Sequence, residues 1–175
     1  MGAHSKRPTL VLKGKYWLYY VLNILFGARK QVFLTFGRWV LVTIFSQSPT
    51  TFAKLSIAAS LIGIWFTPLA GRLIDRLGER TVLMVDSFVL MVVCLAYGGA
   101  EHIGLPRESA LYVVYCAYVI DQLFFAVGMA RDTYMSKIAE TKEDLTASLS
   151  VGVSINHVVA MTVPTLGGLL WTAYG

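Results

Sequence analysis

The sequence has 175 residues, of which 56% are hydrophobic and 14% charged, and its formal net charge is +5. Soluble domains carry about 25% charged residues, so this composition indicates an integral membrane protein. The basic residues stand at the ends of apolar runs and form no patch with interleaved aromatics, so no nucleic-acid partner is expected.

The first half of the chain predicts three membrane-spanning helices. Residues 1–15 are basic and are expected to be a cytoplasmic lead-in. The first span is expected at 16–45, which is long for a perpendicular crossing of the ~30 Å hydrocarbon core and should therefore tilt or protrude. The second span is expected at 52–70 and the third at 81–99, with the polar segment 71–80 between them.

The second half predicts two further spans, which makes five in all. A loop is expected at 101–109, a fourth span at 110–133, a polar stretch at 136–144, and a fifth span from residue 145 to the end of the sequence. The fold class expected is therefore an all-α membrane protein with five transmembrane helices.

The distribution of basic residues predicts the orientation of these helices, because cytoplasmic loops carry an excess of Lys and Arg. On the side expected to be outer, the basic residues are Lys54, Arg107 and Arg38, and Arg38 can snorkel outward. The other side is much more basic. It collects Lys6, Arg7, Lys13, Lys15, Arg72, Arg76, Arg80, Arg131, Lys137 and Lys142. The N-terminus is therefore expected in the cytoplasm, and five crossings would leave residue 175 outside.

The polar segment 71–80 reads Gly-Arg-Leu-Ile-Asp-Arg-Leu-Gly-Glu-Arg and is expected to be a tight cytoplasmic loop. Gly78 can adopt the positive φ that reverses the chain, and Gly71 would allow close helix approach. Asp75 can accept hydrogen bonds from the N–H groups of a neighbouring helix N-terminus.

This pattern resembles the signature loop of the major facilitator superfamily of secondary transporters. Glu79 departs from the pattern, since a basic residue is commoner at that position. The matched positions are Gly71, Leu73, Asp75, Arg76, Gly78 and Arg80.

The resemblance covers roughly residues 16–175 and includes a Pro-x-x-Gly-Gly stretch at 164–168, similar to the penultimate helix of a six-helix half. It implies one incomplete half-bundle, more similar to a C-terminal half, in which case residues 1–15 are the end of a central loop. The family transports small solutes by alternating access, with the solute held between two halves. The partners implied are the solute, with or without coupled protons, the lipid bilayer, and either the missing half or another copy of the chain. The localisation implied is the plasma membrane.

Two explanations of the incomplete half stay open. The chain is either a fragment of a larger transporter, or a small protein that completes itself by oligomerising. A non-transporting membrane fragment or scaffold is the alternative function.

Charged residues inside spans are costly unless they are paired or hydrated, so they are the first functional candidates. Arg29 and Lys30 lie near the middle of the first span, and Asp121 and Gln122 lie at the centre of the fourth. A salt bridge from Asp121 to Arg29 or Lys30 would neutralise both partners. A purely structural pair and a binding site for solute or protons both remain open.

Asn156 and His157 are central in the fifth span and complete the candidates for a solute or proton cavity. A histidine there could carry protons near neutral pH, although an interhelical hydrogen bond is its commoner role. Phosphate-binding loops, metal-ligand spacings and nucleophile motifs are missing from the sequence, so no enzyme activity, catalytic residue, metal or cofactor is expected.

Overall fold

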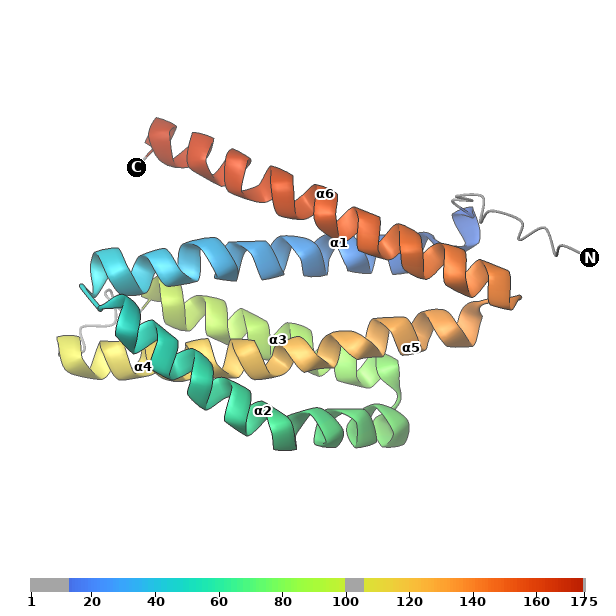
Figure 1. Cartoon of the computed structure of the whole chain (residues 1–175), viewed down its shortest axis with the longest axis horizontal. Helices are drawn as coiled ribbons and strands as arrows, with labels where there is room; N and C mark the ends of the chain where they lie inside the picture. The colour runs from blue at the N-terminus through green and yellow to red at the C-terminus, as the bar shows by residue number, and fades with distance from the viewer. Residues whose placement is uncertain (1–12, 100–105, 175) are drawn as a thin grey trace, which may run out of the picture. The chain divides into compact units, whose positions relative to one another are not determined.

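The computed structural model describes residues 13–99 and 106–174, and every regular element within these ranges is helical (Figure 1). The expected all-α class is confirmed for this part of the chain. The elements are η1 (Gly14–Tyr16), α1 (Trp17–Val32), η2 (Phe33–Gly37), η3 (Val40–Ile44), α2 (Pro49–Leu77), α3 (Glu79–Gly99), α4 (Arg107–Phe124), η4 (Phe125–Gly128), α5 (Met129–Ile138) and α6 (Lys142–Tyr174).

Four of the helical stretches are long and apolar enough to cross a membrane: Pro49–Leu77, Glu79–Gly99, Arg107–Ile138 and Lys142–Ala173. They correspond to the second to fifth spans expected from the sequence. This supports a membrane protein, because an apolar helix of about 20 residues matches the thickness of the hydrocarbon core.

The segment expected as the first span is helical but is not among these four. Its α-helical part, α1, covers only Trp17–Val32, and the chain then passes through two π-helical turns, η2 and η3. Of the expected lead-in 1–15, only residues 13–15 belong to the described part, and the expected loop 101–109 is described only from residue 106. α4 begins at Arg107, inside that expected loop.

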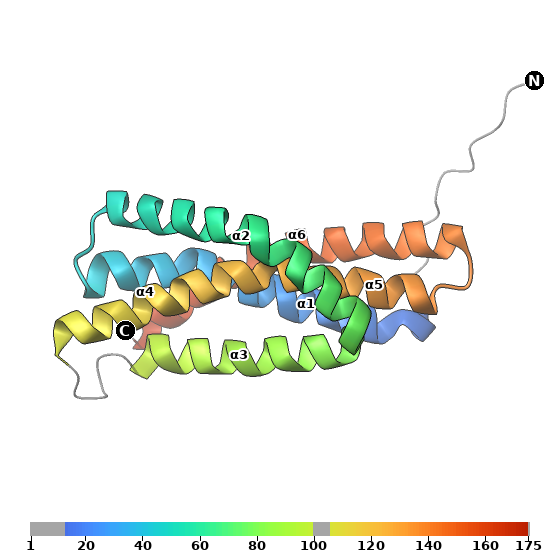
Figure 2. The same cartoon turned by 90° about the horizontal axis from the view of Figure 1, so that it is seen from below.

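The described residues fall into two compact units. We call Val32–Ala130 the middle unit, and Met1–Gln31 together with Arg131–Gly175 the terminal unit. In the middle unit, α4 packs against both α2 and α3 (Figure 2). Its cores are apolar, one around Leu41, Val114 and Tyr118 and another around Ile74 and Val127.

In the terminal unit, α1 and α6 run in the same direction, as Figure 1 shows. Contacts between them advance together along both helices, from Tyr16 with Asp144 to Asn23 with Asn156. The apolar core of this unit is built from three tyrosines of its N-terminal segment with Met135 of α5 and Val151 of α6. Parallel packing agrees with a first and a fifth span that cross in the same direction.

The segment 71–80 is not a loop, which corrects the sequence expectation. α2 continues to Leu77, and a single residue, Gly78, separates it from α3. Arg and Leu residues are good helix formers and are frequent before Gly78, so the helix continues until this glycine. Its φ of 80° confirms the expected reversal, and its N–H donates to the Ile74 carbonyl at 3.0 Å.

Two other expectations for this segment are not met within the described residues. A Cβ built on Gly71 would meet no atom within 4 Å, so none of the described helices approaches closely at Gly71. Asp75 is exposed and no hydrogen bond to its carboxylate occurs among residues 13–99 and 106–174. Leu73, Arg76 and Arg80 are exposed as well.

Gly78→Ala is expected to lower the free energy of unfolding by about 1–3 kcal/mol, because its φ of 80° with ψ of 153° is strained for any residue with a Cβ. Gly71→Ala is the matched control and should be neutral or stabilising by up to about 1 kcal/mol, since the site is helical and open. Unfolding of both variants in detergent checks this. Equal stability of the two variants would contradict the assigned role of Gly78.

Candidate functional site

A line of polar side chains joins α1 to α5 and α6 in the terminal unit, and we call it the polar seam. On α1 and the turn before it, the members follow helical spacing and so share one face. On α6 they recur mostly every fourth residue. The polar seam consists of Tyr16, Tyr19, Tyr20 and Asn23, of Asp144, Ser148 and Asn156, and of Arg131 and Asp132.

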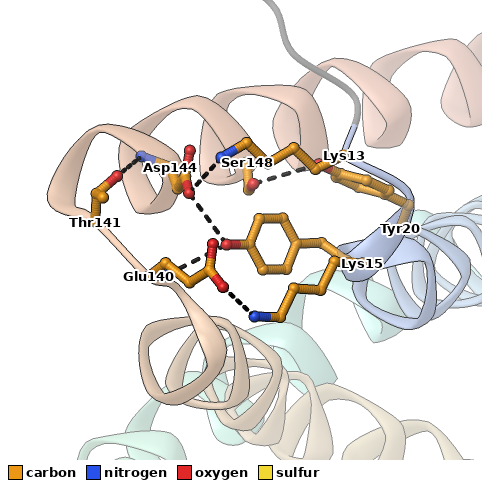
Figure 3. A network of polar contacts seen from close by, with 8 residues as sticks. Lys13, Lys15, Tyr20, Glu140, Thr141, Asp144 and Ser148 are labelled. Atoms are coloured by element: carbon orange, nitrogen blue, oxygen red, sulfur yellow. Dashed lines mark hydrogen bonds and ion pairs between the residues drawn. The ribbon is translucent and has the colours of Figure 1, made fainter.

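One end of the polar seam is an ion-pair network around the α5–α6 turn (Figure 3). Lys13 Nζ donates to Asp144 Oδ2 at 2.7 Å, and Lys15 is paired with Glu140. Tyr16 lies between the two pairs, since its hydroxyl donates to Asp144 Oδ2 at 3.2 Å and accepts from the Glu140 N–H at 3.3 Å. The residues before α1 are thereby fastened to the start of α6.

The same turn caps α6. Thr141 Oγ1 accepts a hydrogen bond from the Asp144 N–H at 3.0 Å, as a threonine at a helix N-cap does. Asp144 therefore lies in the first turn of α6, where a carboxylate is favoured by the helix dipole, while it also binds Lys13. The Thr141 cap therefore positions the Asp144 carboxylate that pairs with Lys13.

These contacts shift the ionisation of the charged groups at the turn. The hydrogen bond from Lys15 holds the pKa of Glu140 below its ordinary value of 4.5. The hydrogen bond to Asp144 raises the pKa of Lys13 above 10.5. Both pairs are therefore fully charged at neutral pH.

Farther along α1, Asn23 makes several contacts of the polar seam, and only 2% of its surface is exposed. Its Nδ2 donates to the Tyr19 carbonyl at 2.9 Å. Its Oδ1 accepts from Asn156 Nδ2 at 3.2 Å and from Arg131 Nη1 at 3.5 Å. One amide thus connects α1, α5 and α6.

Arg131 is a charged residue buried in this unit, with 7% of its surface exposed. Its guanidinium carbon lies 3.4 Å from the centroid of the Phe26 ring, which is the geometry of a cation–π contact. The neighbouring Asp132 accepts a hydrogen bond from the Tyr19 hydroxyl at 3.3 Å. A buried charge in an apolar bundle is costly, so this one is held by the ring and by Asn23.

Two glycines make room for the seam. A Cβ on Gly152 would lie 2.6 Å from the Tyr19 hydroxyl and 3.2 Å from Asn23 Nδ2. A Cβ on Gly27 would lie 2.8 Å from Asn156 Oδ1. Only glycine therefore allows α1 and α6 to approach so closely at these positions.

The Oδ1 atom of Asn156 is buried and has no hydrogen-bond partner in the described part of the chain. A buried acceptor without a donor costs about 1–3 kcal/mol, so a water molecule or a ligand hydroxyl or amine would be favoured there. Among the described members of the polar seam, Asn156 is therefore the one with an unsatisfied buried acceptor.

The structure locates the other sequence candidates differently. Arg29 is half-buried, with its guanidinium carbon 5.8 Å from the centroid of the Phe26 ring, whereas Lys30 and His157 are exposed. Asp121 is buried and Gln122 is half-buried, and both belong to the middle unit. Arg29 and Lys30 belong to the terminal unit, so their expected pairing with Asp121 stays a prediction.

Sequence reasoning missed Asn23 and Arg131 as members of the candidate site. A signal was available, since Tyr16, Tyr20, Asn23 and Gly27 recur at helical spacing, as do the small and polar residues at 144, 148, 152 and 156. Each series marks a polar stripe on an otherwise apolar helix. Matching the two stripes would have predicted the contact between α1 and α6.

Comparisons with models of protein families, with curated protein sequences and with solved structures find no match to this chain. Groups of three or more His, Cys, Asp or Glu side chains that could hold a metal ion do not occur in residues 13–99 and 106–174.

The ion pair of Glu140 predicts a pH-dependent stability. A carboxyl group whose pKa is lowered by folding stabilises the fold above its unfolded pKa, and this contribution is lost as the pH falls through the lowered value. Glu140→Gln should therefore destabilise the wild-type chain at pH 7 more than it destabilises a Lys15→Gln variant, in which the ion pair is already absent. The difference should vanish in acid well below pH 4.5 and shrink at high salt.

Gly152→Ala is expected to destabilise the chain by about 1–3 kcal/mol, because the added methyl group overlaps Tyr19 and Asn23. Gly168→Ala, in the same helix but with nothing within 4 Å, should be neutral or stabilising by up to about 1 kcal/mol. Thermal unfolding in detergent distinguishes them. A Gly152→Ala variant as stable as Gly168→Ala would refute the close contact of α1 with α6.

Proposed function

We propose that this chain is a segment of a transporter of the major facilitator type, which moves a small solute across the plasma membrane by alternating access. The observation that carries the proposal is the α2–α3 junction. Two helices of membrane-spanning length meet at Gly78, and the polar residues of the signature pattern lie on both sides of it.

Charge supports a cytoplasmic N-terminus in this proposal. Successive spanning helices alternate in direction, so the α2–α3 and α5–α6 junctions lie on one side and the start of α4 on the other. The first two carry Arg72, Arg76, Arg80, Lys137 and Lys142, whereas the start of α4 carries Arg107.

Asp75 supplies a contact for another part of the transporter. Its carboxylate is exposed on the last turns of α2 and accepts no hydrogen bond among the described residues. An exposed carboxylate without a hydrogen-bond partner among the described residues fits a docking contact with a helix N-terminus outside them. Such a contact would stabilise one state of the alternation, because it exists only while that helix is near.

The solute would be bound by polar groups inside the helices. Asn156 is supported by its unpartnered acceptor, and Asp121 by its burial at 3% exposure within the middle unit. Lys30, the third candidate, is exposed on the terminal unit. The partner would be the solute, alone or with protons. Hydrogen-bonding groups inside an apolar bundle are the usual means of solute selection.

A second candidate function is a non-transporting membrane fragment or a small scaffold that oligomerises. The exposed apolar surface of α6 favours it, since Met161 is 76% exposed and Leu169 and Leu170 are each 61% exposed. In an oligomeric scaffold these side chains would pack against the helices of other copies. The two candidates differ in whether a solute crosses the membrane.

The transport proposal is tested by Asp75→Asn in the cells that make the protein. A contact of a carboxylate with a helix N-terminus contributes about 0.3–2 kcal/mol, so the flux of the transported solute should fall by roughly two- to thirtyfold. The measurement is uptake of a panel of radiolabelled anionic, cationic and neutral metabolites into membrane vesicles, at equal protein level.

Glu143→Gln serves as the control, because Glu143 is an exposed carboxylate at the α5–α6 turn outside the signature pattern. It should leave every flux unchanged. Wild-type fluxes in the Asp75→Asn vesicles would remove the role assigned to Asp75. Fluxes that do not change even when the whole chain is deleted would favour the scaffold.

A further inference from the structure

The chain passes between the terminal unit and the middle unit twice. The first passage lies between Gln31 and Val32, and the second between Ala130 and Arg131. Both passages fall within continuous helical segments and not in loops. Any change in the arrangement of the two units must therefore be absorbed by helical backbone at these two places.

The helix departs from α geometry at both passages. The π-helical turn η2 begins at Phe33, one residue after Val32. The 3-10 turn η4 ends at Gly128, two residues before Ala130. A π-turn widens the helix and a 3-10 turn tightens it. A 3-10 stretch within a long helix often marks a hinge, and π-turns are frequent at functional sites.

Each of these turns ends in a glycine, Gly37 in η2 and Gly128 in η4. Glycine has the largest conformational freedom of all residues, so it lowers the cost of changing φ and ψ at the turn. The two turns thus combine an irregular hydrogen-bond pattern with a permissive residue.

Charged residues flank both passages on the terminal-unit side. Arg29 and Lys30 precede the first passage, and Arg131 and Asp132 follow the second. Lys30 and Asp132 are exposed, whereas Arg131 is buried over the Phe26 ring. Polar groups near the passages can satisfy the backbone groups that an irregular turn leaves without an α-helical partner.

We infer that the two passages form a paired hinge, at which the terminal unit pivots against the middle unit while each unit stays rigid. The pivots are η2 in the first helical segment and η4 between α4 and α5. This inference goes beyond the proposed function and does not depend on it, because the motion can be measured without a solute.

The test compares distances between spin labels in purified, detergent-solubilised protein. Cys94 and Cys116 are first replaced by Ala, and pairs of new cysteines are then labelled. The pair Glu143 and Ser87 reports the distance between the two units, because Glu143 lies in the terminal unit and Ser87 in the middle unit. Ser60 with Ser87 reports on the middle unit alone, and Leu25 with Glu143 on the terminal unit alone. All four side chains are exposed.

The distance distribution between the units should be broader than both distributions within a unit, or should have more than one maximum. Gly37→Ala should narrow it, because alanine favours regular α-helix over glycine. The added methyl group would meet Phe33 at 3.5 Å and Tyr97 at 3.7 Å, which are ordinary contacts, so the variant should fold.

Gly63→Ala is the matched control, because Gly63 is also helical and its added methyl group would meet only Leu123 at 4.0 Å. It should leave all three distributions unchanged. A between-unit distribution as narrow as the other two would overturn the hinge. An equal response to Gly37→Ala and Gly63→Ala would overturn the assignment of η2 as a pivot.

Discussion

The terminal unit depends on the side-chain amide of Asn23. Apolar helices gain little by packing against one another in lipid, so polar contacts and small residues decide which faces meet. Asn23 Oδ1 accepts hydrogen bonds from both Asn156 and Arg131, and thereby joins three helices through one side chain. This contact requires glycine at positions 152 and 27. A Cβ at Gly152 would overlap Tyr19 and Asn23, and a Cβ at Gly27 would overlap Asn156. The ion pairs at the α5–α6 turn continue these polar contacts to the start of α6.

Much of the fold could be predicted from the sequence, because helix length and apolarity are local properties. Four of the five expected spans are helices of membrane-spanning length, and the positive φ of Gly78 followed from the need to reverse the chain in a short distance. The extent of the turn could not be read in the same way. Five charged residues in 71–80 suggested a loop, but charge does not break a helix, and α2 continues until Gly78. The π-turns after α1 were also missed, since they depend on hydrogen-bond register and not on composition.

The candidate site was predicted only in part. Asn156 was proposed because it is polar and central in its span, and it does belong to the polar seam. Arg131 was read as an interfacial residue, whereas it is buried over Phe26, a contact that depends on how α5 packs against α1. The pairing of Asp121 with Arg29 or Lys30 involves residues of the two different units and stays a prediction. Local sequence identifies which residues need a partner, while tertiary packing decides which partner they obtain.

The central claim is that these helices cross a membrane, with the α2–α3 and α5–α6 junctions in the cytoplasm. Single cysteines at Arg80, Glu143 and Glu108, in a chain without Cys94 and Cys116, test it most directly, because all three positions are exposed. A membrane-impermeant thiol reagent applied to intact cells should label only the cysteine at 108, and those at 80 and 143 should react only after permeabilisation. Labelling at position 80 or 143 in intact cells, or no labelling at 108, would contradict the account.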